Sequence, residues 1–262
     1  MDGFSLEAIS RVPLAEAVML LFRSVTDEDL LTSIWDEHRG RCYDRVISFP
    51  LIVHLISDAL LTSKSGRQSF QHNMQPGILE ASVQAAYQKL AHLPIAVSEA
   101  FLERSTAVLR RTFPEWSAWQ RPKSLQAFRI VTYDGKAIKK VARRLKPLRG
   151  TKGGLIGGRA LVALDWDTNM AVTMHGESDG EANEVKHTGT VVRRVNELFS
   201  GFKLHVGDRA FCDLVQPKHF MASPGDQFLV RYHRKTKFHR DLSVDERVGV
   251  TSTGAVSYTH LT

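Results

Sequence analysis

The strongest constraint on the fold is a change of pattern at Phe128, where apolar residues stop recurring at helical spacing and begin to alternate. Phe128–Asp134 (FRIVTYD) and Arg159–Asp165 (RALVALD) are rich in β-branched and aromatic residues, which is typical of strands. Met170–His175 (MAVTMH) follows across a turn at Asp167-Thr168-Asn169. The sequence therefore predicts three strands in succession.

Helices and strands alternate after these three strands. The run 184–199 places Val191, Val192 and Val195 on one helical face. Lys203–Asp208 (KLHVGD) reads as a strand, 214–221 as a helix, and 227–232 as a further strand after a Pro-Gly-Asp turn. Three strands, a helix, a strand, a helix and a strand form a mixed α/β order. This order predicts a ribonuclease-H-like mixed sheet with flanking helices over residues 124–232.

The first 120 residues predict helices only. Prolines 13 and 50 stand where a first-turn proline begins a helix, and Thr26-Asp27-Glu28-Asp29 resembles an N-cap followed by acids in the first turn. The segment 113–123, with two prolines and two tryptophans, reads as a connector. We expect an all-α N-terminal region over residues 1–120.

The composition favours a polyanionic partner and a cytoplasmic location. The chain has 35 Lys and Arg against 28 Asp and Glu, a formal net charge of +7, and such an excess favours nucleic acid first and an acidic membrane surface second. Its two cysteines, Cys42 and Cys212, have no CxxC spacing, which fits a reducing compartment. The most apolar stretch, Phe49–Leu61, is too short to span a bilayer, so we expect no membrane partner.

Two aspartates stand at matching places in the predicted sheet. Asp134 is predicted to end the first core strand, and Asp208 the fourth. Because side chains alternate along a strand, Asp134 shares a face with Ile130, and Asp208 shares one with Val206. If the two strands are parallel neighbours, both carboxylates converge at the carboxyl edge of the sheet, where open α/β sheets place their sites.

A pair of carboxylates on rigid strands suits chemistry on a phosphodiester. Such a pair can hold two Mg²⁺ ions about 3.5–4 Å apart, one activating the attacking oxygen and one stabilising the leaving oxygen. Each residue also has a plainer interpretation. Asp134-Gly135 is a strong hairpin-turn dipeptide, and Asp208 could cap the segment after its strand. The pairing is what favours a site.

At these residues the sequence resembles the insertion-sequence-four group of DDE transposases. The similarity runs over about residues 124–232. It consists of the strand ending in Asp134-Gly135-Lys136, the segment 177–184 (ESDGEANE) before a helix, Asp208-Arg209-Ala210-Phe211, and the strand 228–231 (FLVR). In the family, the second catalytic acid lies in a pattern of Asp, any residue, Gly or Ala, then an aromatic residue, which Asp208-Arg209-Ala210-Phe211 fits. The 74-residue spacing of Asp134 and Asp208 also suits the family.

The resemblance implies catalysis and metal binding by Asp134 and Asp208. It implies two Mg²⁺ ions, for which Mn²⁺ can substitute, hydrolytic nicking at transposon ends, and attack of the freed 3′-hydroxyl on target DNA. It further implies a homodimer on double-stranded DNA in a bacterial cytoplasm, associated with the nucleoid. In the family the N-terminal helical region helps to recognise transposon ends, so the resemblance also implies that residues 1–120 contribute to binding of DNA ends. A third catalytic acid is implied on a helix beyond a β-rich insertion, whose beginning we expect at 233–255.

The pattern around that third acid (Tyr, two residues, Arg, three residues, Glu, six residues, Lys) is absent after Tyr232 and after Tyr258. We therefore expect a C-terminally truncated enzyme that binds DNA with little or no strand transfer. The tail 256–262 (VSYTHLT) back-translates to a transposon-end adaptor used in sequencing libraries, which would explain the truncation. A natural β-strand is the alternative for these residues.

Basic residues follow Asp134 closely. Between Lys136 and Arg159 there are nine Lys or Arg and no acid, which favours contact with phosphates over a merely solvated face. We expect DNA binding by Lys136, Lys139, Lys140, Arg143, Arg144, Lys146, Arg149, Lys152, Arg209 and Arg231. The glycines at 153, 154, 157 and 158 lack a GxxxxGK[ST] pattern and read as a flexible connection between strands.

Two other functions remain open from the sequence. One is a non-catalytic DNA-binding remnant of a transposase. The other is a ribonuclease-H-like nuclease of another kind, which would need further acids at the same edge of the sheet. The candidates for those acids are Glu177, Asp179, Glu181 and Glu184.

Overall fold

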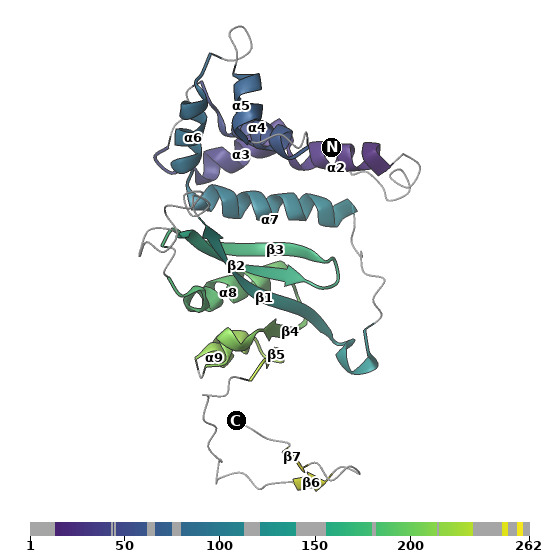
Figure 1. The fold of residues 1–262 in the computed structure, drawn as a ribbon. Coiled ribbons are helices and arrows are strands. Elements are labelled where there is room, and N and C mark those ends of the chain that lie inside the picture. The colour runs from purple at the N-terminus through teal and green to yellow at the C-terminus, as the bar shows by residue number, and fades with distance from the viewer. Residues whose placement is uncertain are drawn as a thin grey trace.

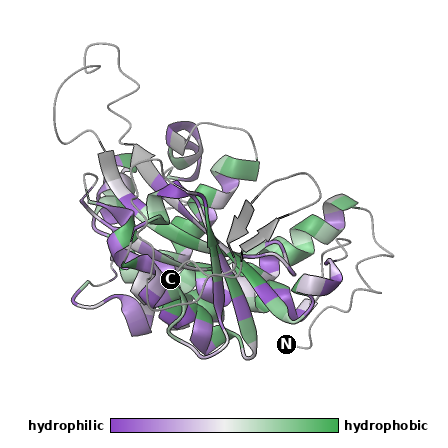
Figure 2. Ribbon diagram, turned by 90° about the horizontal axis from the view of Figure 1, so that it is seen from below, coloured by the Kyte–Doolittle hydropathy of each residue, from purple (hydrophilic) through white to green (hydrophobic). Residues whose placement is uncertain are grey.

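A computed structural model describes residues 14–42, 44, 46–61, 66–74, 80–112, 121–139, 156–179, 182–213, 215–232, 248–250 and 256–258. They form a group of helices above a mixed β-sheet, with the long helix α7 between the two (Figure 1). Apolar and polar segments alternate through the sheet and its helices in Figure 2. No helix in these ranges has the length and apolarity that a membrane crossing requires.

The elements described before residue 113 are all helices, as predicted. They are α2 (Leu14–Val25), α3 (Glu28–His38), α4 (Phe49–Leu61), α5 (Gly66–Asn73), α6 (Val83–Ala91) and α7 (Ile95–Thr112). The carboxylate of Asp27 caps α3 by accepting from the backbone N–H of Leu30 at 3.1 Å, which satisfies a donor that the first turn leaves free. Pro50 stands in the first turn of α4, as its fixed φ favours.

The central sheet has five strands in the order β3-β2-β1-β4-β5. The strands are β1 (Phe128–Lys139), β2 (Ile156–Asp165), β3 (Met170–Glu177), β4 (Phe202–Gly207) and β5 (Gln227–Val230). β2 runs antiparallel to both β1 and β3, whereas β1, β4 and β5 run parallel. This order and these directions are those of a ribonuclease-H-like sheet, so the predicted fold class is confirmed. Separately, β6 (Val248–Val250) pairs antiparallel with β7 (Val256–Tyr258).

Short helical elements connect the strands and cover one face of the sheet. They are η4 (Glu184–His187), α8 (Thr188–Leu198), η5 (Arg209–Phe211) and α9 (Gln216–Phe220), whereas η1 (Lys123–Leu125) precedes β1. Val191 and Val195 of α8 and Phe220 of α9 pack with Val131 and Leu161 of the strands, all fully buried. Burial of this apolar face is the main term that holds α8 and α9 on the sheet.

Helix α7 binds the outer edge of β3. The buried carboxylate of Glu99 accepts from the backbone N–H of Gly176 at 2.8 Å and from Arg194 Nη2 of α8 at 3.0 Å. The hydroxyl of Thr106 donates to the carbonyl oxygen of Ala171 at 2.7 Å. Side chains of α7 therefore satisfy backbone groups that an edge strand would expose, and the helical region is joined to the sheet.

Two local predictions were wrong. Asp134 does not end β1, and Asp134-Gly135 is not a turn, because β1 continues to Lys139 in pairing with β2. A type I′ hairpin would need positive φ at both residues, and neither has it. Gly158, predicted in a flexible connection, lies in β2 beside a β-bulge with φ +154°, where a Cβ would meet the Glu177 carbonyl oxygen at 2.6 Å. Glycine is needed at that position.

Candidate active site

Asp134 lies in β1, and Asp208 directly follows the neighbouring parallel strand β4. The last registered pair of the β1–β4 ladder is Tyr133 with Gly207, so the next residue of each strand is one of the two aspartates. Adjacent strands are about 4.8 Å apart, and registered residues of parallel strands face the same side. The predicted parallel pairing is confirmed, and it places Asp134 and Asp208 one residue beyond the same rung, at the carboxyl end of β4.

The two carboxylates differ in their protein contacts. Asp134 is exposed, and its carboxylate makes no hydrogen bond or ion pair with any residue that the structure describes. Asp208 is also exposed, and its Oδ1 accepts from the backbone N–H of Ala210 at 2.8 Å, capping η5. The capping interpretation of Asp208 is therefore correct, but it occupies one oxygen only. The other oxygen faces no described donor at hydrogen-bond distance.

Three exposed basic residues lie close to the pair in the backbone. Val230 of β5 is registered with Gly207, and the backbone N–H of Arg231 donates to the Gly207 carbonyl oxygen at 3.4 Å. Arg231 thus stands beside Asp208 on the strand that follows. Lys136, two residues beyond Asp134 on the same face of β1, is exposed, as are Arg209 and Arg231. At this edge Asp134 lies in β1, Asp208 follows β4, and Arg231 follows β5.

The side chains of the other predicted DNA-binding residues lie outside the described part of the structure. Lys139 lies in β1, but its side chain lies outside the described part of the structure. Lys140, Arg143, Arg144, Lys146, Arg149 and Lys152 lie outside the described residues altogether. Their contact with DNA stays a prediction.

No family model and no curated protein matches the sequence. Among solved structures, a piggyBac transposase in a synaptic complex with hairpin DNA is similar at 10% identity with a TM-score of 0.41, over 84% of this chain and 51% of that one. The Mos1 transposase in a strand transfer complex is similar at 9% identity with a TM-score of 0.26, over 72% and 77% of the two chains. A Mos1 paired-end complex with the left transposon end gives 11% identity and a TM-score of 0.27, over 76% and 56%.

The chain thus spans about half the length of the piggyBac transposase that it matches. The fold rests on the strand order and strand directions given above, since similarities at this level do not decide it.

The other acidic residues considered from the sequence do not join the pair. The Glu184 side chain lies against Gly135, where an added Cβ would be 2.8 Å from the carboxyl carbon, and it forms an ion pair with Arg159. Because neighbouring residues of a strand face opposite sides, Glu184 lies across the sheet from Asp134. Glu177 ends β3, two strands away, and accepts from the Asp179 N–H at 3.1 Å. Glu181 lies outside the described residues.

The donor set at the edge fits a hard divalent cation in part. Mg²⁺ binds through one or two carboxylates and keeps its other positions for water and substrate phosphate, and the Asp134 and Asp208 oxygens supply that number. Among the described residues, no group of three or more His, Cys, Asp or Glu side chains is arranged to hold a metal ion. The described residues therefore supply two carboxylate ligands and no third one at this edge.

Beneath the edge lies a buried polar chain that sequence reasoning missed. The Tyr133 hydroxyl is 2.7 Å from His205 Nδ1, and His205 Nε2 is 3.3 Å from an Asp226 oxygen. Burial lowers the pKa of His205, although Asp226 acts in the opposite direction. Burial, with the charge of Asp226, raises the pKa of Tyr133 well above its usual value. A histidine at an inward position of an apolar strand was the available signal.

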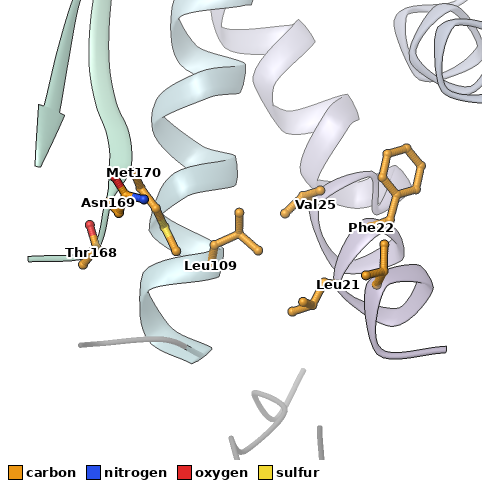
Figure 3. A pocket seen from close by; sticks show the side chains of 8 residues that line it. Leu21, Phe22, Val25, Leu109, Thr168, Asn169 and Met170 are labelled. Carbon is orange, nitrogen blue, oxygen red and sulfur yellow. The ribbon is translucent and has the colours of Figure 1, made fainter. Parts of the chain in front are cut away.

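An apolar pocket lies away from this edge. It has a volume of about 460 Å³ and is formed by α2, α7 and the β2–β3 turn. Phe22 also lines it, and Leu21 and Val25 of α2 lie opposite Leu109 and Met170 (Figure 3). Its lining contains no ionisable side chain, so it offers no group for acid, base or metal chemistry.

Proposed function

We propose that this chain is the core of a DDE-type DNA transposase that acts on double-stranded DNA through Asp134 and Asp208. The observation that carries the proposal is the register of β1 and β4, which makes the two carboxylates neighbours at an exposed edge. Asp134 and Asp208 each come one residue after the last rung of the β1–β4 ladder. Asp134 has no described protein partner, and Asp208 uses one oxygen to cap η5. The family, insertion-sequence-four, is proposed from the Asp208-Arg209-Ala210-Phe211 motif and its spacing from Asp134.

Each residue at the edge has a distinct task in this proposal. Asp134 and Asp208 hold divalent magnesium, for which manganese substitutes, through carboxylate oxygens. When bound, the two ions expected in this family supply an activated attacking oxygen and stabilise the leaving oxygen of the phosphodiester. Arg231, Arg209 and Lys136 bind neighbouring phosphates and place the scissile bond over the acids, without reading the base sequence.

Manganese binding tests the pair directly. We expect the chain to bind Mn²⁺ in a competition titration against Mg²⁺, and Asp134→Asn or Asp208→Asn to weaken that binding at least about tenfold. Glu177→Gln is the matched control, because it removes a carboxylate from the same edge of the sheet but two strands away. Equal binding by Asp134→Asn and the parent chain would reject the assignment. A loss only in Glu177→Gln would indicate a different nuclease site.

DNA binding tests the role of the basic residues at this edge, Lys136, Arg209 and Arg231. We expect Arg231→Ala to weaken binding of a short duplex and to reduce the slope of log affinity against log salt by about one, as loss of one phosphate contact does. Arg193→Ala is the control, since Arg193 is also exposed but belongs to α8 on the other face of the sheet. If both variants lose affinity equally, the binding surface is not this edge.

A non-catalytic DNA-binding protein is the second candidate. It is favoured by the lack of a three-ligand metal group among the described residues. This candidate predicts salt-dependent duplex binding that is unchanged by Asp134→Asn and by added Mn²⁺. The transposase proposal predicts that Mn²⁺ alters the affinity for DNA and that Asp134→Asn removes this effect. The dimer on paired DNA ends belongs to the transposase proposal and is tested by the mass of the DNA complex.

A further inference from the structure

Three buried polar residues link the strands that carry the acids. Tyr133 of β1 is 3% exposed, His205 of β4 is fully buried, and Asp226, in the turn before β5, is 3% exposed. Their side chains form a chain of hydrogen bonds. The Tyr133 hydroxyl is 2.7 Å from His205 Nδ1, and His205 Nε2 is 3.3 Å from Asp226 Oδ2. Asp226 also accepts from the backbone N–H of Lys203 at 2.9 Å. We name Tyr133, His205 and Asp226 the buried relay.

The direction of each hydrogen bond follows from the chemistry of its partners. An ionised carboxylate only accepts, so His205 Nε2 must carry the hydrogen that points to Asp226. In neutral imidazole the other nitrogen then only accepts, so the Tyr133 hydroxyl donates to Nδ1. Every member of the buried relay is satisfied in one arrangement. The Lys203 ammonium, 3.6 Å from Asp226, balances the buried negative charge.

The buried relay lies directly under the candidate site. Tyr133 and Gly207 form the last rung of the parallel ladder, and the residue after each is Asp134 or Asp208. The Tyr133 ring also packs against Phe220 of α9, with 5.4 Å between ring centroids. The hydrogen bond between Tyr133 and His205 therefore fixes the register of β1 against β4 next to the two aspartates.

We propose that Tyr133, His205 and Asp226 are positioning residues that lock the β1–β4 register so that Asp134 and Asp208 form one metal-binding pair. The metal-binding part rests on the proposed function, whereas the register part does not. A slip of one residue would turn Asp134 to the other face of the sheet. The slip would also leave three buried polar groups without partners, at a cost that makes the alternative register unfavourable.

A purely apolar core would not give this selectivity. Tyr133 and His205 both pack on Phe220, and phenylalanine in their places would keep much of that packing. Apolar contacts are non-directional and tolerate small shifts, whereas a chain of hydrogen bonds has fixed lengths and angles. Packing against Phe220 therefore does not explain why Tyr133 and His205 are polar.

Three measurements test the buried relay. In the unmodified chain, nitrogen NMR of the His205 ring should report a neutral ring with the hydrogen on Nε2. In Tyr133→Phe, which keeps the ring, amides of 132–134 and 206–208 should exchange with deuterium about fivefold faster than the change in global stability accounts for. In the same variant, Mn²⁺ affinity should fall about threefold to tenfold.

Thr168→Val is the matched control for Tyr133→Phe. Thr168 is also a buried hydroxyl (1% exposed), and it donates to Asp165 at 2.6 Å at the β2–β3 turn, away from the acids. It should change global stability by a similar amount and leave both the local exchange and the Mn²⁺ affinity unchanged.

The outcomes separate the two proposals. A hydrogen on Nδ1, or exchange at 206–208 that merely follows global stability in Tyr133→Phe, would overturn the buried relay. Accelerated local exchange with unchanged Mn²⁺ affinity would overturn its link to the metal pair. If the unmodified chain binds no Mn²⁺, the proposed function fails, while the exchange and NMR results still decide the register claim.

Discussion

Aspartates stand at both ends of the central sheet, in opposite surroundings. Asp165, where β2 turns toward β3, is completely buried. Arg129 donates to its two oxygens from Nε at 2.8 Å and from Nη2 at 2.7 Å, and the Thr168 hydroxyl donates at 2.6 Å. Asp134, on the adjoining strand, is exposed and has no protein partner among the described residues.

The difference separates a structural carboxylate from one that is available for binding. Burial alone would raise the pKa of Asp165, but hydrogen bonds from Arg129 and Thr168 hold it below its usual value. The protein itself therefore supplies everything that this charge needs. At the other end, two carboxylates are placed together and given one backbone donor between them. Exposed carboxylates with so few protein donors keep oxygens that can bind a partner from outside the fold.

The largest expected effect is on the buried side of this comparison. Asp165→Asn removes the charge that faces the bidentate Arg129 and should lower the free energy of unfolding by about 3 kcal/mol. Denaturant unfolding measures this change. Asp167→Asn is the control. Asp167 lies in the same turn, but its carboxylate is farther from Arg129, at 3.9 Å, and its side chain is 20% exposed. If the two variants lose equal stability, the buried ion pair is not the special feature of this turn.

The second prediction concerns acid. Because the pKa of Asp165 is lower in the folded chain than its usual 3.8, folding favours its ionised form. The stability from this carboxylate is fully present above about pH 3.8 and is lost as the pH falls through the folded pKa. Unfolding measured from pH 6 downward should show a steeper loss below pH 4 in the parent chain than in Asp165→Asn. Parallel curves would contradict the assignment.

Much of this comparison could be predicted from the sequence, because local patterns identify the strands and their succession along the chain. The alternation in Phe128–Asp134 and the run Lys203–Asp208 identify β1 and β4, and a helix between them implies a crossover to a parallel strand. The convergence of Asp134 and Asp208 follows from that order alone. Asp165 gave no comparable signal, since its partner Arg129 is 36 residues away in sequence.

The errors arose where tertiary pairing overrides local signals. Asp134-Gly135 is a turn dipeptide by itself, yet β2 extends back to Ile156 and keeps β1 in the sheet. The buried relay joins three segments that share no local motif. Asp226 was read as part of a Pro-Gly-Asp turn, which it is, but the turn also buries its carboxylate against β4. Only the pairing of β4 with β5 brings that turn to His205.

A smaller effect is expected at Asp208. Asp208→Ala removes the carboxylate that caps η5 through the Ala210 N–H and should lower the free energy of unfolding by about 1 kcal/mol. Asp208→Asn keeps an oxygen that can accept the same bond and should lose only a few tenths. Comparing the two variants by denaturant unfolding isolates the structural share of this residue. A large loss in both would place Asp208 with Asp165 as a structural carboxylate.

The smallest change in stability is expected at Asp134, and its sign is informative. Asp134→Asn breaks no contact with the described residues, so the free energy of unfolding should change by less than about 0.5 kcal/mol. Without divalent cations the change should be toward higher stability, because the variant removes repulsion from Asp208. With Mg²⁺ present the order should reverse, since a ligand that binds only the folded chain stabilises it. Thermal unfolding of both chains, with and without Mg²⁺, measures this reversal. A variant that is less stable than the parent under both conditions would mean that Asp134 contributes to the fold, as Asp165 does, and would remove the main physical reason for placing a metal at this edge.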